Sequence, residues 1–113
     1  MNDPQPLKLE IDVDPDGAIV RCRGKLTSVA SGTFHTEVKR LIPQTARITI
    51  DLTDVTFMDS MGLGTIATLY VSAKTAGCQL QLINLSPRVR ELFSVTHLLS
   101  LFEPCGESNI PIP

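Results

Sequence analysis

Tryptophan is absent from the sequence, and aromatic residues make up only 4% of its 113 positions. Basic charge is not in excess either, because ten Lys and Arg are set against twelve Asp and Glu and the formal net charge is −2. A surface that binds nucleic acid neutralises phosphates with clustered cations and stacks bases on aromatic rings. The composition therefore argues against nucleic acid as a partner of this protein.

Membrane and export signals are also missing. The most apolar stretch, Met61 to Ala73, is interrupted by glycines and hydroxyl-bearing residues, and it is shorter than the roughly 20 residues that a bilayer requires. The segment from Met1 to Pro6 has neither the basic flank nor the apolar core of a signal peptide. We therefore expect no insertion into a membrane and a cytoplasmic location.

The residues that form most metal centres and catalytic sets are few and scattered. The cysteines Cys22, Cys78 and Cys105 form no C-x-x-C pair, and neither His35 nor His97 has a partner at metal-ligand spacing. Free cysteine is among the most buried residue types, so the sequence favours packing over catalysis for Cys22 and Cys78. We expect a reducing compartment, no metal, no cofactor and no enzymatic activity.

The chain nevertheless has the composition of a globular protein, with 42% hydrophobic and 19% charged residues. Its length corresponds to one domain that can bury a core without metals or disulfides. We predict a single domain over residues 1–113, with a core from about residue 7 to about residue 103. The segment 104–113 contains three prolines and few residues that pack, so a loose tail is expected there.

A hairpin is predicted at the start of this core. Apolar and polar residues alternate over Leu7–Val13 and again over Ala18–Arg23, which is typical of strands with one buried face. Between them, Asp14–Gly17 contains the Asp, Pro and Gly residues of a tight turn. Gly24 interrupts the second run, and we expect the strand to end there.

The remaining predicted elements alternate between helix and strand. The first is a helix capped by Ser28, Ser31 or Thr33 and stopped by Pro43, and it is followed by a strand at 47–52 and a connection at 53–59. The second helix runs from Asp59 or Ser60 to Gly77, and its predicted buried face consists of Leu63, Ile66, Tyr70 and Ala73. A strand at 79–83, a helix that begins with Ser86 and Pro87, and a last short strand or turn at 98–102 complete the order. This order predicts an α/β fold, a mixed sheet of four to five strands with helices packed against it.

Two glycines lie in the first turns of the second predicted helix. Gly62 and Gly64 each cost helix stability, about 1 kcal/mol relative to Ala. Close packing of the helix on a strand is the interpretation that composition favours. Close approach of another molecule is the alternative.

Ser60 has two interpretations at the same helix start. With Asp59 it is a good N-cap residue, and a cap would explain it fully. It could also be phosphorylated, because a helix N-terminus offers free N–H groups and a positive dipole end to a phosphate carrying about −1.5 to −2 charges. The residues alone give Ser60 only a slight preference over the other serines.

The segment Ile48–Gly64 reads ITIDLTDVTFMDSMGLG and resembles the signature of STAS-domain proteins, above all of bacterial anti-sigma factor antagonists. Their pattern is an apolar strand, D-L-(S/T)-x-V, an apolar pair and D-S-(S/T)-G-L-G. Ala76–Pro87 resembles the family's G-x-x-L-x-L strand and N-x-S-P step. Val89–Phe102 resembles its third helix and the turn into the last strand. The likeness covers nearly the whole predicted core.

This resemblance implies a mechanism called partner switching. In the family, the unphosphorylated antagonist binds an anti-sigma factor that is also a serine kinase, and this frees a sigma factor. Phosphorylation of the serine releases the partner, and a PP2C-type phosphatase reverses it. Carried onto this chain, the phosphorylated residue is Ser60, and the implied partner-binding residues include Asp59, Met61, Gly62 and Leu63.

Two positions depart from the family pattern. Where the family often has an acidic Gly-x-Leu-Asp step, this chain has Gly24–Thr27 with the sequence GKLT. Lys25 and Thr27 are therefore expected in the partner-binding surface, with a lysine added and an acid lost. Met61 replaces the usual Ser or Thr after the switch serine and adds an adaptable apolar contact.

Other interpretations follow if the serine is not switched. The chain would then be a constitutive STAS subunit of a transporter ATPase or of a signalling assembly, and the Ser60 hydroxyl would only cap a helix. An enzyme ranks well behind both, because no nucleophile–base or metal grouping is visible.

Overall fold

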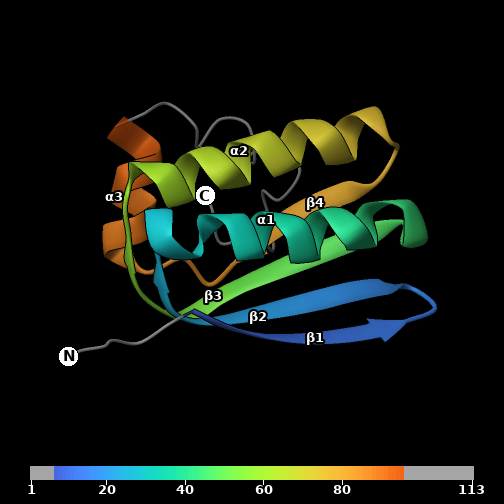
Figure 1. The fold of residues 1–113 in the computed structure, drawn as a ribbon, viewed down its shortest axis with the longest axis horizontal. Helices are drawn as coiled ribbons and strands as arrows, with labels where there is room; N and C mark the ends of the chain where they lie inside the picture. The colour runs from blue at the N-terminus through green and yellow to red at the C-terminus, as the bar shows by residue number, and fades with distance from the viewer. Residues whose placement is uncertain (1–6, 96–113) are drawn as a thin grey trace.

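Four strands form one mixed sheet in the computed structural model, which describes residues 7–95 (Figure 1). The elements are β1 (Lys8–Asp14), β2 (Gly17–Leu26), α1 (Ser28–Leu41), a 3-10 turn η1 (Ile42–Gln44), β3 (Arg47–Met58), α2 (Ser60–Thr75), β4 (Gln79–Ile83) and α3 (Pro87–Val95). The spatial order of the strands is β1-β2-β3-β4. The predicted α/β class, with a four-stranded mixed sheet and helices packed against it, is confirmed.

The connections explain why the sheet is mixed. β1 and β2 are antiparallel and joined by a tight turn in which the Asp14 carboxylate accepts hydrogen bonds from the backbone N–H groups of Asp16 and Gly17. β2 and β3 are parallel, as are β3 and β4. Parallel neighbours need a crossover connection, and α1 and α2 supply these two crossovers.

The core lies between the sheet and its helices. Figure 1 shows α1 and α2 running side by side along the same side of the sheet. Alternate residues of the strands point toward them and are buried, while most of the residues between these positions are half-buried or exposed. The largest fully buried side chains are Leu26, Phe34, Ile48, Ile50, Leu52, Ile66, Leu69, Leu82 and Phe93. Their removal from water is the main contribution to the stability of the fold.

The second and third strands are longer than the alternation predicts. The expected end of β2 at Gly24 and the expected connection over 53–59 are both wrong, because the two strands stay paired as far as Leu26 and Met58. Two register shifts interrupt this pairing. Beyond Leu52 the buried residues of β3 therefore recur every third position instead of every second. An irregular strand of this kind does not show the period-two pattern.

The helix boundaries are partly as predicted. The capping of α1 by Ser28, Ser31 or Thr33 is wrong, because the N-cap is Thr27 and its side chain makes no capping bond. α2 ends at Thr75, and Gly77 follows in a left-handed conformation (φ +78°), as predicted for a glycine after a helix. α3 begins at Pro87.

The buried face of α2 also differs in one residue. Leu63, Ile66 and Ala73 are buried as predicted, but Leu69 is the fourth fully buried side chain and Tyr70 is only half-buried. The predicted strand or turn at 98–102, the tail over 104–113, His97 and Cys105 lie outside the described residues.

Candidate phosphorylation and partner-binding site

The carboxyl ends of β2 and β3 lie at one end of the molecule, and the helices that follow them begin there (Figure 1). The backbone N–H of Asp59 donates to the carbonyl of Leu26 at 3.3 Å, so the two strand ends are joined directly. Open α/β sheets bind their ligands at the carboxyl ends of parallel strands. This end of the molecule is therefore the natural place to look for a functional site.

Asp59 holds the first turns of two helices. One carboxylate oxygen accepts from the N–H of Gly62 in α2 at 3.0 Å, and the other accepts from the N–H of Ser28 in α1 at 3.2 Å. Each helix leaves its first N–H groups without an intrahelical partner, so one carboxylate satisfies a donor in both. It also places a negative charge at two positive dipole ends. Of the two predicted N-cap residues, Asp59 is the one that caps α2.

Ser60 is the first residue of α2 and is exposed. Its hydroxyl makes no hydrogen bond within residues 7–95, and Asp59 provides the cap of α2 instead. Met61 follows with 56% of its surface exposed. Ser60 and Met61 of the predicted switch motif are therefore both accessible, and Asp59 holds the helix start on which they lie.

Gly62 and Leu63 lie below this surface. A Cβ on Gly62 would stand 2.2 Å from the carbonyl oxygen of Leu26, so close packing of helix on strand accounts for this glycine. Leu63 is buried in the core. Gly64 differs, because it is exposed and a Cβ there would meet nothing within 4 Å. Partner binding by Gly62 and Leu63 stays a prediction, and in this structure they support the surface that Ser60 and Met61 present.

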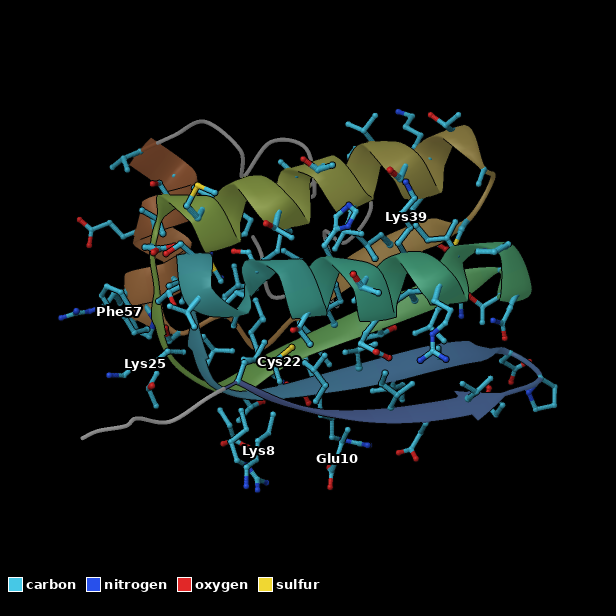
Figure 2. All side chains as sticks on the ribbon, viewed as in Figure 1. Lys8, Glu10, Cys22, Lys25, Lys39 and Phe57 are labelled. Atoms are coloured by element: carbon cyan, nitrogen blue, oxygen red, sulfur yellow. The ribbon has the colours of Figure 1, made fainter. Side chains whose placement is uncertain are left out.

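The two residues of the altered Gly-x-Leu-Asp step, Lys25 and Thr27, lie beside this surface. Lys25 is exposed near the end of β2, and Figure 2 shows it at the same end of the molecule as Phe57. Thr27 is half-buried, and its carbonyl accepts from the N–H groups of Ala30 and Ser31. The Thr27 backbone is therefore part of the first turn of α1, whereas the exposed Lys25 has no ion-pair partner among residues 7–95.

Two accessible residues were not found by sequence reasoning. Val29, in the first turn of α1, is 91% exposed, and Phe57, three residues before Ser60, is 40% exposed. Phe57 lies in the segment that the sequence predicts as a connection, where alternation assigns no role to an apolar residue. The only available signal was a large apolar residue next to a motif that resembles a binding surface.

A second polar network lies farther back on β3, around Asp51. One of its carboxylate oxygens accepts from the Thr53 N–H at 2.9 Å, from the Thr53 hydroxyl at 2.5 Å and from the Asn84 side-chain amide at 3.1 Å. Partial burial by itself raises the pKa of Asp51, but these hydrogen bonds and the nearby Arg21 outweigh it, and the pKa is lowered overall. The network ties β3 to the turn after β4.

That turn leads directly into α3. Asn84 adopts a left-handed conformation (φ +60°), and the Ser86 hydroxyl accepts from the Val89 N–H at 3.2 Å. The predicted cap by Ser86 and first-turn position of Pro87 are confirmed. The start of α3 is thus positioned by the hydrogen bonds of Asp51 with Thr53 and Asn84, together with the Ser86 cap. These residues belong to the D-L-T and N-x-S-P parts of the family pattern.

The two described cysteines and His35 are the remaining side chains that could act in catalysis or metal binding. Cys22 and Cys78 are buried, and burial, with a smaller contribution from Asp51, raises the pKa of the Cys22 thiol to about 12. Such a thiol is not a nucleophile at neutral pH. His35 is half-buried on α1. Among residues 7–95, no three His, Cys, Asp or Glu side chains gather as metal ligands, and no helix there is long and apolar enough to cross a bilayer.

Comparison with known protein families shows which family this chain resembles. The family model for the STAS domain matches residues 8–109, nearly the whole chain. The chain belongs to the STAS domain family. The predicted family is thereby confirmed, and the Asp59–Gly62 segment lies within the matched domain.

One relative agrees with this membership, and solved structures share the fold. The anti-sigma-B factor antagonist of Bacillus subtilis is 28% identical over 91% of this chain and 94% of its own length. An anti-sigma factor antagonist from Mycobacterium paratuberculosis superposes with a TM-score of 0.79 at 18% identity, over 90% of this chain and 87% of that one. The antagonist SpoIIAA gives 0.71 at 23% identity in its unphosphorylated form, over 80% of this chain and 82% of that one. Its phosphorylated form, from Bacillus, gives 0.67 at 22% identity, over 80% and 85%.

Proposed function

We propose that this STAS domain is an anti-sigma factor antagonist whose binding is switched at Ser60. When Ser60 is unphosphorylated, the protein binds an anti-sigma factor that is also a serine kinase, and phosphorylation of Ser60 by that kinase releases it. A PP2C-type phosphatase restores the binding form. The protein acts by binding and catalyses no reaction itself.

One observation carries this proposal: the Ser60 hydroxyl is exposed and is not used as a helix cap. The alternative of a constitutive STAS subunit gave this hydroxyl a capping role, but Asp59 performs that role in the structure. A solvent-facing hydroxyl on a fixed helix start is what a kinase requires of its substrate. The relative from Bacillus subtilis, named an anti-sigma-B factor antagonist, and the SpoIIAA structure in a phosphorylated form support the same function.

The electrostatics of the site allow the modification without unfolding. A phosphate on Ser60 would lie at the N-terminus of α2, where N–H groups and the helix dipole favour a dianion. The neighbouring Asp59 carboxylate opposes it by like-charge repulsion. These effects partly cancel within the domain, whereas a partner surface packed on Ser60 would meet the full new charge.

Paired baits test the proposal. Ser60→Ala and Ser60→Asp proteins are used to capture proteins from a lysate of the source cells, and the retained proteins are identified by mass spectrometry. We expect an ATP-binding anti-sigma factor on the Ala bait and its loss from the Asp bait. Because Asp carries less charge than phosphoserine, the decisive comparison uses wild-type protein phosphorylated by the captured kinase. Retention of the same transporter ATPase or assembly by both baits would contradict the proposal and favour the constitutive subunit.

A further inference from the structure

Several exposed apolar side chains lie on the elements that meet at the end of the molecule where Ser60 begins α2. Among residues 7–95, the large exposed apolar residues include Phe57 before Ser60, Met61 after it, Val29 in the first turn of α1 and Val95 in the last turn of α3. Single exposed apolar residues are normal on a protein surface, but a group of them around one site marks an interaction surface.

A pocket of about 410 Å³ lies between the end of β3 and α3. Phe57 and Met58 line it from the strand, and Val89, Leu92 and Val95 line it from the helix. Phe57 and Val95 are 40% and 65% exposed, so the pocket opens to the surface through apolar side chains. Its strand side runs directly into the helix start that presents Ser60.

Two cations flank this pocket. Arg88 is an exposed residue of its lining, and Lys25 is the direct strand partner of Phe57, visible at the same end of the molecule in Figure 2. Within the described part of the chain neither has an ion pair, whereas Arg21 and Arg23 are paired with acids. The pocket lining itself contains one cation, Arg88, and one acid, Glu91. Lys25, paired with Phe57 on the neighbouring strand, adds a second cation beside it.

We infer that the cationic–aromatic patch, formed by Lys25, Phe57, Arg88 and the pocket beside them, is a second contact for the anti-sigma factor that binds at Ser60. The inference rests on the proposed function. The occupant is an acidic segment of that factor, which inserts an apolar side chain beside Phe57 and pairs its carboxylates with the two cations. Complementary charge at the rim of an apolar contact fixes register and speeds association.

The patch also links binding to the state of Ser60. Phosphorylation adds a dianion three residues after Phe57, on the same strand-to-helix segment. Lys25 and Arg88 attract that dianion as well as the partner's carboxylates, so the phosphate weakens the pairing of the partner with these cations. The phosphate also repels the acidic partner directly. The lysine at position 25 therefore makes this surface accept an acidic partner and makes its release depend on phosphate.

Affinity measurements test the patch. The probe is the anti-sigma factor captured by the Ser60→Ala bait, purified and titrated against the full-length, unphosphorylated protein. Lys25→Glu, Arg88→Glu and Phe57→Ala are each expected to raise Kd about tenfold or more. Lys39→Glu makes the same charge change in the last turn of α1, away from the patch in Figure 2, and is expected to change Kd by no more than about twofold. Circular dichroism verifies that each variant is folded.

The outcomes separate the patch from the switch. If Ser60→Asp or phosphorylation abolishes binding while the three patch variants behave like Lys39→Glu, the patch is wrong and the proposed function stands. If Phe57→Ala lowers thermal stability without changing Kd, the pocket is covered by the protein's own chain and the patch is again wrong. If no anti-sigma factor binds the Ala bait, both proposals fail. A weaker salt dependence of Kd in Lys25→Gln/Arg88→Gln than in the wild type would support the pairing of charges.

Discussion

Asp51 and Asp59 lie on the same strand-to-helix segment, but their surroundings are different. Around Asp51, Thr53 and Asn84 direct three donors at a single carboxylate oxygen, and all of these donors come from this chain. Around Asp59, the carboxylate is equally occupied, but the next side chains, Ser60 and Met61, face solvent. The first half of the family motif therefore fixes the fold, and the second half combines a rigid support with groups left free for a partner.

The largest effect is expected where the second half is packed against the strand. Gly62→Val would press a branched side chain into the Leu26 carbonyl, and we expect a loss of about 3 kcal/mol or more in unfolding free energy. Gly64→Ala is the matched control, because it meets nothing within 4 Å and should gain up to about 1 kcal/mol from helix propensity. Urea denaturation measures both. Equal effects of the two substitutions would contradict the packing of α2 on Leu26.

Asp59→Ala is expected to cost about 2 kcal/mol, at the upper end for a helix cap, because it removes an acceptor from two helix starts at once. Asp59→Asn keeps one acceptor oxygen, so an intermediate loss is expected. Urea denaturation at neutral pH, with hydrogen exchange at the Ser28 and Gly62 amides, measures this. If Asn were as stable as Asp, the bridge between α1 and α2 would contribute nothing.

At the other carboxylate, the expected loss is smaller and depends on pH. Because the pKa of Asp51 is lowered in the folded state, its stabilising contribution is present above the unfolded pKa and is lost as pH falls through the folded value. Asp51→Asn resembles the protonated form and should cost about 1 kcal/mol at pH 7. The gap between wild type and variant should close as pH falls below about 4. A gap that stays constant in denaturation from pH 7 to pH 3 would show that charge is not the cause.

Most of the fold could be predicted from local patterns. The bounds of β4 and the cap of α3 follow from alternation and from Ser86–Pro87, because neighbours in sequence determine both. The cap of α1 could not be predicted, because its acceptor is on Asp59, 31 residues away from Ser28. The length of β3 depends on bulges in its pairing with β2. Tertiary contacts decide such features, and a single sequence does not show them.

The candidate site, too, is only partly predictable from the sequence. Resemblance to a motif points to Ser60, and the residues alone also allow it to cap α2. Only the structure shows that Asp59 occupies that role and leaves the hydroxyl free. Phe57 and Arg88 could not be joined in advance, since they meet only through the packing of α3 beside β3.

The smallest effect is expected for Ser60→Ala, within about 0.5 kcal/mol of the wild-type unfolding free energy. The hydroxyl is exposed and makes no hydrogen bond within residues 7–95, so its removal leaves the cap by Asp59 intact. Urea denaturation of the Ala variant beside Asp59→Ala separates the two neighbours directly. A loss of about 1 kcal/mol or more in Ser60→Ala would mean that the hydroxyl caps α2 in solution. It would then be less available to a kinase, and the constitutive-subunit interpretation would gain the support that the free hydroxyl now gives to the switch.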